Sequence, residues 1–218
     1  MSMALLETPL RIMLVDDHPI VRRGVRDILV DAFPEAHIEE VGLGSDAMTL
    51  VQTSLWDIVI LDLTLPDESG LEVLKRIREW QPRLPVLVLS MHAAEQFARR
   101  SIAAGASGYL TKDTADQELV AATMRLLRGG KYFGPQVLEQ VALSVHPDRG
   151  GRPHERLSDR EFQILRLIGS GRTVSEIATT LGLSSKTIST YRARVLEKMD
   201  MRTNAELTHY VVQHKLTE

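Results

Sequence analysis

Short apolar runs and amphipathic segments alternate along the first 130 residues of the chain. Four apolar runs have the length and composition of buried strands, and they cover residues 11–15, 56–61, 85–89 and 108–110. Residues 37–41 (HIEEV) give a weaker strand pattern. Apolar residues at helical spacing in the segments between them predict helices over residues 19–30, 45–53, 71–80, 96–104 and 116–128. A strand followed by a helix, five times over, predicts an α/β fold with a doubly wound, five-stranded parallel sheet.

This alternation stops at Gly129-Gly130, so the first domain is predicted to span residues 10–130. A further helix is predicted over residues 135–144. The polar stretch 146–156 contains glycine and proline and has no period, which predicts an exposed segment. Residues 131–156 are therefore interpreted as a linker with a helix in it.

The remaining residues, 157–218, predict a small domain made only of helices. Ser158 precedes Glu161 by three positions, which is a capping box in which each side chain satisfies a free amide of the first turn. Glycines end the first two helical patterns, and Ser184 or Ser185 can cap the third. The predicted helices run from this box to Gly169, and over residues 174–181, 185–199 and 204–214.

The composition is that of a folded protein and excludes several classes of function. Of 218 residues, 44% are hydrophobic and 25% charged, and there is no cysteine. The absence of cysteine excludes a disulfide scaffold, a thiolate metal site and a cysteine nucleophile. No run approaches the roughly 18 apolar residues of a membrane span, and no signal peptide is evident, so a cytoplasmic protein is expected.

The net charge of −3 hides an asymmetry between the two domains. Residues 1–151 hold 15 basic and 21 acidic residues, a net charge of −6, whereas residues 152–218 hold 11 and 8, a net charge of +3. An acidic first part and a basic second part indicate modules with different partners.

Charged and polar side chains follow the ends of four predicted strands. Asp16 and Asp17 follow the first strand, Asp62 the third, Ser90 the fourth and Lys112 the fifth. Ligands of an open α/β sheet bind outside the carboxyl ends of its strands, so these groups should meet there. Clustered carboxylates need a cation, and hard oxygen ligands favour Mg²⁺. An aspartate could then attack phosphorus while the lysine and the hydroxyl bind phosphoryl oxygens.

At these residues the sequence resembles the receiver domain of bacterial two-component response regulators. The matching segments are LVDDHPIVRRG (14–24), VILDLTLPDESGLEV (59–73), VLVLSMH (86–92) and GASGYLTKD (105–113). The resemblance implies a CheY-like fold with Asp62 as the phosphoacceptor. It implies that Asp17 and Asp62 hold Mg²⁺, with Asp16 acting through water and Thr64 through its backbone carbonyl, and that Lys112 binds the phosphoryl group.

The same resemblance implies a switch and a phosphodonor. Ser90 and Tyr109 match the hydroxyl and aromatic positions that swing inward on phosphorylation, and the phosphoryl group would come from a sensor histidine kinase. The histidines, among them His18, His37 and His92, have no metal-ligand spacing and are interpreted as surface or turn residues.

Residues 157–214 resemble the helix-turn-helix output domain of the NarL/FixJ (LuxR-type) regulators, carried by the text LSDREFQILRLIGSGRTVSEIATTLGLSSKTISTYRARVLEKMDMRTNAEL. The third helix of this domain would then lie in the major groove of promoter DNA. Apolar residues at helical spacing (Ile188, Val195, Leu196 and Met199) should face the core. The predicted phosphate contacts are Lys186, Thr187 and Lys198, and the predicted base readers are Ser189, Thr190, Ala193 and Arg194, with Arg192 also in reach of DNA.

The combined prediction is a DNA-binding transcription regulator switched by phosphorylation, not an enzyme. A homodimer is expected on phosphorylation or on DNA, and RNA polymerase is a further candidate partner. Two alternatives stay open on the residues alone. The acidic site could serve a phosphatase with an aspartyl intermediate, and the helical module could bind another protein instead of DNA.

Overall fold

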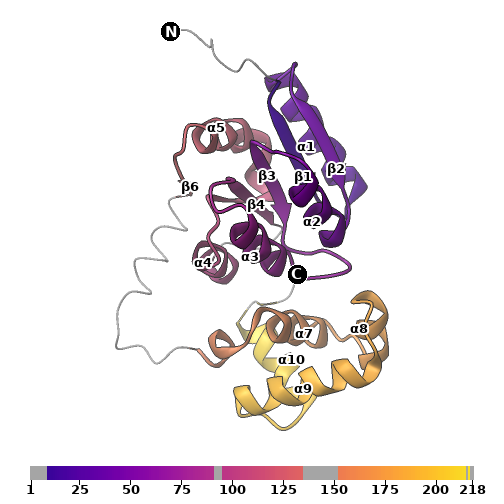
Figure 1. The fold of residues 1–218 in the computed structure, drawn as a ribbon. Coiled ribbons are helices and arrows are strands. Elements are labelled where there is room, and N and C mark those ends of the chain that lie inside the picture. Colours follow the sequence, from indigo (N-terminus) through magenta and orange to yellow (C-terminus); the bar gives the residue numbers. More distant parts are fainter. Residues whose placement is uncertain (1–8, 91–94, 135–151, 215, 217–218) are drawn as a thin grey trace. The chain divides into compact units, whose positions relative to one another are not determined.

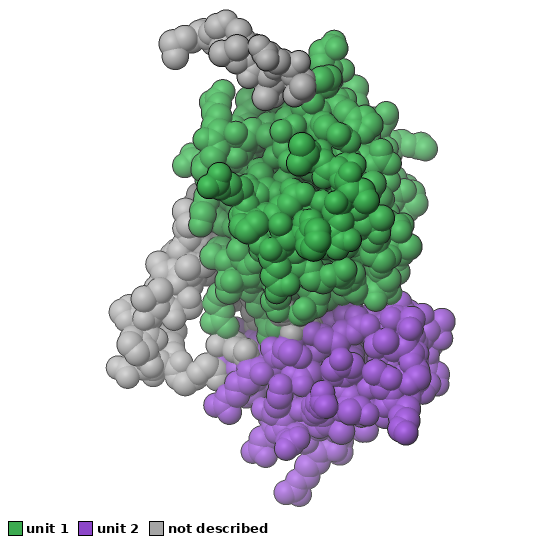
Figure 2. All heavy atoms as spheres, in the orientation of Figure 1, with its two compact units in different colours: residues 1–143 green, residues 144–218 purple. Residues whose placement is uncertain are grey.

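A computed structural model describes residues 9–90, 95–134, 152–214 and 216. The chain divides into two compact units, residues Met1–Leu143 and Ser144–Glu218 (Figures 1 and 2). Each unit has its own buried apolar core.

The first unit is a parallel sheet covered by helices on both faces (Figure 1). The sheet has the strand order β2-β1-β3-β4-β5-β6, and all of its neighbouring pairs are parallel. The strands are β1 (Arg11–Val15), β2 (His37–Val41), β3 (Ile58–Asp62), β4 (Val86–Ser90), β5 (Gly108–Thr111) and β6 (Tyr132–Phe133). The doubly wound α/β fold and its five predicted strands are confirmed. Strand β6 was not predicted, because two residues are too short to produce a pattern.

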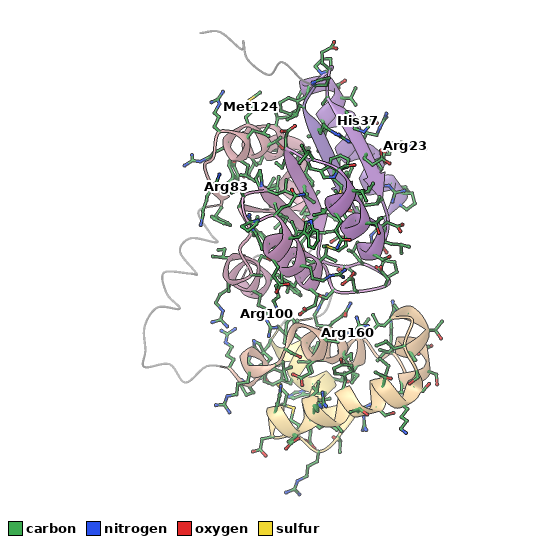
Figure 3. All side chains as sticks on the ribbon, viewed as in Figure 1. Arg23, His37, Arg83, Arg100, Met124 and Arg160 are labelled. Carbon is green, nitrogen blue, oxygen red and sulfur yellow. The ribbon has the colours of Figure 1, made fainter. Side chains whose placement is uncertain are left out.

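Five helices flank this sheet, as predicted. They are α1 (Pro19–Ala32), α2 (Gly44–Thr53), α3 (Gly70–Trp80), α4 (Glu95–Ala103) and α5 (Ala115–Leu127), with the 3-10 turn η1 (Lys112–Thr114) before α5. Residues of α1 and α5 share one apolar cluster, and residues of α2, α3 and α4 share the other. The side chains fill the space between the sheet and its helices (Figure 3).

Strand β3 is an example of why a strand in the middle of this sheet has a continuous apolar sequence. Ile58 and Ile60 point to the layer of α1 and α5, whereas Val59 and Leu61 point to the opposite layer. Every residue of β3 is buried, because helices cover both faces of the sheet. The one charged residue of this strand, Asp62, comes last.

The second unit contains the helices α7 (Asp159–Gly169), α8 (Val174–Thr180), α9 (Ser185–Met199) and α10 (Asn204–Gln213). The predicted capping box of Ser158 and Glu161 is confirmed at the start of α7, and Ser184 caps α9. Thr173 and Glu176 form a second capping box that was not predicted, although its Thr-x-x-Glu spacing is present in the sequence. The turn between α8 and α9 contains Gly182 at φ +61°, a backbone conformation that favours glycine.

Part of the predicted linker is folded. Residues Pro153–Arg156 form a 3-10 turn, η2, and His154 is fully buried, with its Nδ1 2.5 Å from the Tyr210 hydroxyl. The prediction of an exposed stretch through residue 156 is therefore wrong at His154, which joins the aromatic core of Phe162 and Tyr210. The helix predicted over residues 135–144 lies outside the described residues. Among the described helices, none is long and apolar enough to cross a membrane.

Candidate functional site

Two buried carboxylates lie side by side at the carboxyl ends of β1 and β3. These strands pair in parallel with Val15 opposite Leu61, so Asp16 and Asp62 follow at the same edge of the sheet. Asp16 is only 1% exposed and Asp62 2% exposed. Two charges withdrawn from water in this way need a counterion.

Lys112 provides that counterion. It begins η1 directly after β5, and its Nζ lies 2.7 Å from Asp16 Oδ2 and 2.8 Å from Asp62 Oδ2. The lysine side chain is itself only 5% exposed. Three residues from three different strands therefore meet at one point, as the sequence predicted from the strand ends.

Burial and the neighbouring opposite charge act against each other on the pKa of Asp62 and on that of Lys112. Burial, together with the nearby Asp16 carboxylate, raises the pKa of Asp62 to about 6, against the opposing effect of Lys112. Burial lowers the pKa of Lys112, but the carboxylates of Asp62 and Asp16 raise it more, so its net pKa lies above the ordinary value. The lysine thus stays a fixed positive charge beside Asp62.

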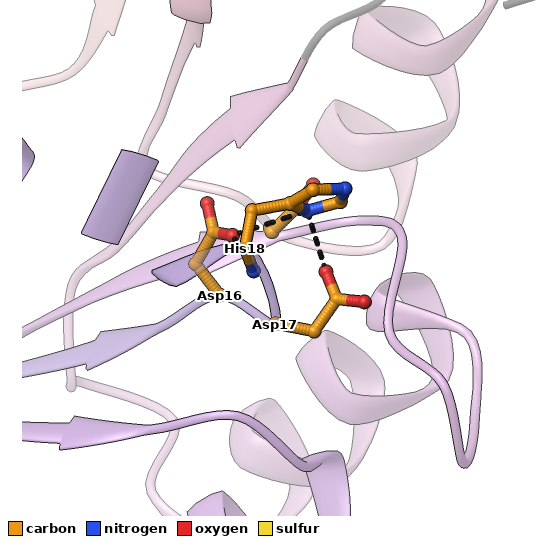
Figure 4. Close-up of side chains that lie close together, drawn as sticks. Asp16, Asp17 and His18 are labelled. Carbon is orange, nitrogen blue, oxygen red and sulfur yellow. Dashed lines mark hydrogen bonds and ion pairs between the residues drawn. The ribbon is translucent and has the colours of Figure 1, made fainter. Parts of the chain in front are cut away.

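Asp17 and His18 complete the group on the side of α1 (Figure 4). His18 Nδ1 lies 2.6 Å from Asp17 Oδ1, 3.4 Å from Asp16 Oδ1 and 3.9 Å from Asp62 Oδ2. His18 is 54% exposed, so the interpretation as a surface residue describes its exposure but misses its contacts. Its position next to Asp16-Asp17 is the signal that could have identified it.

The donor set fits a divalent cation. Each of Asp16, Asp17, His18 and Asp62 offers one ligand atom, and these atoms all lie within 4.8 Å of one another. Two buried oxygens, Asp16 Oδ2 and Asp17 Oδ1, have ion-pair contacts but accept no well-aligned hydrogen bond. Carboxylate oxygens in such a cluster are the ligands that Mg²⁺ prefers.

The loop after β3 is held tightly against the site. The Thr64 amide donates to Asp62 Oδ1 at 3.1 Å. A Cβ on Gly70 would lie 2.2 Å from the Asp62 carbonyl oxygen, so only glycine fits there. Asp67 accepts from the amides of Gly44 and Ser45, each at 2.9 Å, which ties the loop to the start of α2. These bonds lower the pKa of Asp67 although burial raises it. The roles of Gly70 and Asp67 are not predicted from the sequence.

Ser90 and Tyr109, the predicted switch residues, are both buried. Ser90 ends β4 and is paired with Thr111 of β5. Tyr109 lies in the middle of β5, with Val88 of β4 on one side and Phe133 of β6 on the other. The tyrosine therefore occupies an inward position in the layer of α2, α3 and α4.

The predicted DNA-contacting residues lie on α9, and they differ in exposure and in the hydrogen bonds that they form within the second unit. Lys186, Ser189, Thr190, Ala193 and Arg194 are exposed, and Ile188, Val195 and Met199 are buried as predicted, with Leu196 half-buried.

Several of the predicted contacts have partners within the second unit. On α9 itself, Thr190 Oγ1 donates to the Lys186 carbonyl at 3.0 Å, and the Arg194 guanidinium lies 5.9 Å from the centroid of the Tyr191 ring. Thr187 belongs to the cap of α9, where its amide donates to Ser184 Oγ at 3.1 Å. Arg192 Nε donates to Asn204 Oδ1, and Lys198 Nζ donates to Glu161 Oε2 at 2.7 Å. The most open face of α9 is therefore formed by Lys186, Ser189, Thr190, Ala193 and Arg194.

Comparison with known families and relatives covers both units. Residues 12–124 match the family of response regulator receiver domains, and residues 155–211 match the bacterial regulatory proteins of the luxR family. The chain is 35% identical to the response regulator UvrY of Escherichia coli K12 over 95% of both proteins. It is 33% identical to the response regulator GacA of Pseudomonas aeruginosa, over 96% of this chain and 98% of that protein.

Solved structures are similar over one or both units. A complex of the two-component response regulator RcsB with DNA is 25% identical, with a TM-score of 0.57 over 94% of this chain and 98% of that chain. A LuxR-family two-component response regulator from Aurantimonas sp. SI85-9A1 is 38% identical, with a TM-score of 0.57 over 63% of this chain and 98% of that chain.

Proposed function

The chain belongs to the two-component response regulators that join a receiver domain to a LuxR-family DNA-binding domain, and on this premise we propose a role for each part of the site. The protein is a DNA-binding transcription regulator, and its receiver domain implies a phosphodonor kinase. This family consists of transcription regulators and not of classical enzymes. The proposal concerns which residues receive, hold and transmit the signal.

We propose that Asp62 is the phosphoacceptor. The observation that carries this assignment is the bridge of Lys112 Nζ to Asp16 Oδ2 and Asp62 Oδ2, at 2.7 and 2.8 Å, which fixes a positive charge where phosphoryl oxygens would develop negative charge. An Asp62 carboxylate oxygen attacks the phosphorus of a phosphohistidine on a sensor histidine kinase. The P–O bond forms while the P–N bond breaks, and the departing imidazole keeps the electron pair and takes up a proton.

The acidic cluster would hold Mg²⁺ for this step. Asp17 and Asp62 would bind the ion directly, Asp16 through a water, and Thr64 through its carbonyl. When bound, the ion neutralises the carboxylates and withdraws charge from the phosphoryl oxygens. Lys112 would keep the Asp62 carboxylate oriented, because its Nζ contacts both Asp62 and Asp16.

Labelling with radioactive acetyl phosphate tests the assignment. The wild-type protein should acquire an acid-stable, hydroxylamine-sensitive label that depends on Mg²⁺, and Asp62→Asn should acquire none. Asp46→Asn is the matched control, because Asp46 is an exposed carboxylate of α2 outside the site. A hydroxylamine-sensitive label that persists in Asp62→Asn would refute the assignment.

The conformational response to phosphorylation would start at Ser90 and Tyr109. The Ser90 hydroxyl would bind a phosphoryl oxygen, and the population of inward Tyr109 would rise in response. Both residues are buried, and Ser90 ends β4 at the edge of the sheet where Asp62 ends β3, so a phosphoryl group on Asp62 would bias the arrangement of Ser90 first. A homodimer with two recognition helices on two half-sites would follow.

For the output we propose that α9 lies in the major groove of promoter DNA in the cytoplasm, with RNA polymerase as a further partner. Lys186 and Thr187 would contact phosphates, and Ser189, Thr190, Ala193 and Arg194 would read base edges. Lys198 and Arg192 would reach DNA only by giving up their bonds to Glu161 and Asn204.

A gel-shift assay on its own promoter region, with and without acetyl phosphate, tests the output. Binding should tighten on phosphorylation and weaken steeply with added salt, since each phosphate contact releases counterions. Binding that ignores salt would contradict the major-groove assignment and favour a protein partner for the helical module.

A further inference from the structure

We propose that His18 is a nitrogen ligand of the cation site, and that it shifts the preference of this site from Mg²⁺ towards first-row transition metals. The inference rests on the metal site proposed above and adds a residue and a selectivity to it. It starts from the way one imidazole nitrogen is placed among three carboxylates.

The His18 side chain does not form the helix-capping hydrogen bond that is common at its position. His18 is the N-cap of α1, and N-cap side chains commonly accept a hydrogen bond from the first turn. The His18 side chain makes no such bond, and Pro19 at the next position contributes no amide donor. The His18 amide instead donates to Asp16 Oδ1 at 2.8 Å, which draws the residue towards the acidic cluster.

His18 Nδ1 lies within 4 Å of one oxygen of each of the three carboxylates. Nδ1 lies 2.6 Å from Asp17 Oδ1, 3.4 Å from Asp16 Oδ1 and 3.9 Å from Asp62 Oδ2. In an octahedral site with bonds of about 2.1 Å, neighbouring ligand atoms lie about 3.0 Å apart and opposite ones about 4.2 Å apart. The separation from Asp62 Oδ2, a proposed direct ligand, falls within that range, and the separation from Asp17 Oδ1 is about 0.4 Å shorter than its lower end.

Lys112 does not compete for the same oxygens of Asp16 and Asp17. Its Nζ contacts Asp16 Oδ2 and Asp62 Oδ2, whereas the nearest contacts of His18 are to Asp17 Oδ1 and Asp16 Oδ1. The lysine and the histidine therefore approach different oxygens of Asp16. At 54% exposure His18 leaves the site open to an ion from solvent.

Nitrogen ligation changes which ions bind best. Mg²⁺ prefers oxygen ligands and gains little from imidazole, whereas Mn²⁺, Co²⁺, Ni²⁺ and Zn²⁺ accept imidazole readily. The carboxylates alone should bind Mg²⁺, and the carboxylates with His18 should favour transition metals. The ion that fits this site best is thus a divalent transition metal that accepts both carboxylate oxygens and one imidazole nitrogen.

Pulsed EPR on the full-length protein loaded with Mn²⁺ tests the inference directly. The signal of wild-type protein should carry the modulation of a directly bonded ¹⁴N nucleus, and His18→Ala should lose it. His37→Ala is the matched control, because His37 lies on β2 (Figure 3) and contacts Glu39 and the Trp56 ring instead of the cluster. Since the His18 side chain forms no cap bond, His18→Ala should fold normally, and its tryptophan fluorescence should match that of wild type.

Calorimetric titrations give the selectivity. Loss of groups that only support a metal ligand already costs about 10–100-fold in affinity, so His18→Ala should weaken Mn²⁺ and Co²⁺ by at least about tenfold. Its Mg²⁺ affinity should change by less than about twofold. Mn²⁺ bound to wild type without ¹⁴N modulation, or modulation that survives in His18→Ala, would overturn the role of His18 and leave the Mg²⁺ site standing. If wild type binds neither ion, the proposed metal site fails as well.

Discussion

Asp62→Asn should stabilise the first unit at neutral pH, although it removes the proposed phosphoacceptor. Burial raises the pKa of Asp62 to about 6, from an ordinary value of 3.8. Holding the carboxylate ionised at pH 7.5 therefore costs the folded state about 3 kcal/mol, at 1.36 kcal/mol per pKa unit. Asparagine is nearly the same shape and carries no charge, so the variant avoids this cost while Lys112 keeps its contact with Asp16.

The gain should depend on pH in a defined direction. Because the pKa of Asp62 is higher in the folded state than in the unfolded state, the folded state binds the proton more tightly. The stability contributed by the protonated group is fully present below pH 3.8 and is lost as the pH rises through 6. The advantage of Asp62→Asn should thus fall from about 3 kcal/mol at pH 7.5 to about 1 kcal/mol at pH 4.5.

Urea unfolding in the presence of EDTA measures this difference. Both tryptophans of the chain, Trp56 and Trp80, lie in the first unit, so their fluorescence reports the unfolding of that unit alone. The exposed Asp46→Asn variant serves as the control and should match wild type at both pH values. A variant that is no more stable than wild type at pH 7.5, or equally more stable at both pH values, would refute the reasoning.

Further substitutions probe the output helix and the packing. Lys186→Ala should weaken binding to all DNA sequences about equally and reduce the salt slope of a gel-shift titration by about one. Arg194→Ala should instead relax one base position by about 1–3 kcal/mol in a competition assay, and an equal loss at every position would make it a phosphate contact. Ser158→Ala should cost the second unit about 1 kcal/mol in thermal unfolding, because it removes the cap of α7. Gly70→Ala should lower stability by about 1–3 kcal/mol and slow acetyl phosphate labelling, since its Cβ meets the Asp62 backbone, and normal labelling would contradict that link.

The strand ends explain how much of the site could be predicted from the sequence. In a parallel sheet every strand ends at the same edge, so polar residues after apolar runs must meet there. This rule predicts that Asp16, Asp62 and Lys112 lie together, and the short distances from Lys112 to both carboxylates agree with it.

Features fixed by contacts distant in sequence could not be predicted in this way. His154 belongs to a polar stretch, and only the fold brings it against Tyr210. Gly70 follows a turn-rich segment in which glycine is common, so its close approach to the Asp62 carbonyl left no local signal. The engagement of Lys198 by Glu161 joins two helices 37 residues apart in sequence, which a helical periodicity cannot reveal.

Strand β6 has a practical consequence for dissecting the protein. It pairs with Gly108 and Tyr109 along the outer side of β5, and the Tyr132 hydroxyl donates to Glu118 at 2.9 Å to anchor it. Without these two residues β5 would be a bare edge, and unpaired edge strands recruit strands from other molecules and aggregate. A receiver fragment that stops at residue 130 should therefore be prone to self-association for an artificial reason. A fragment that extends past Phe133 keeps β5 paired, so a dimer that it forms does not arise from an uncovered β5.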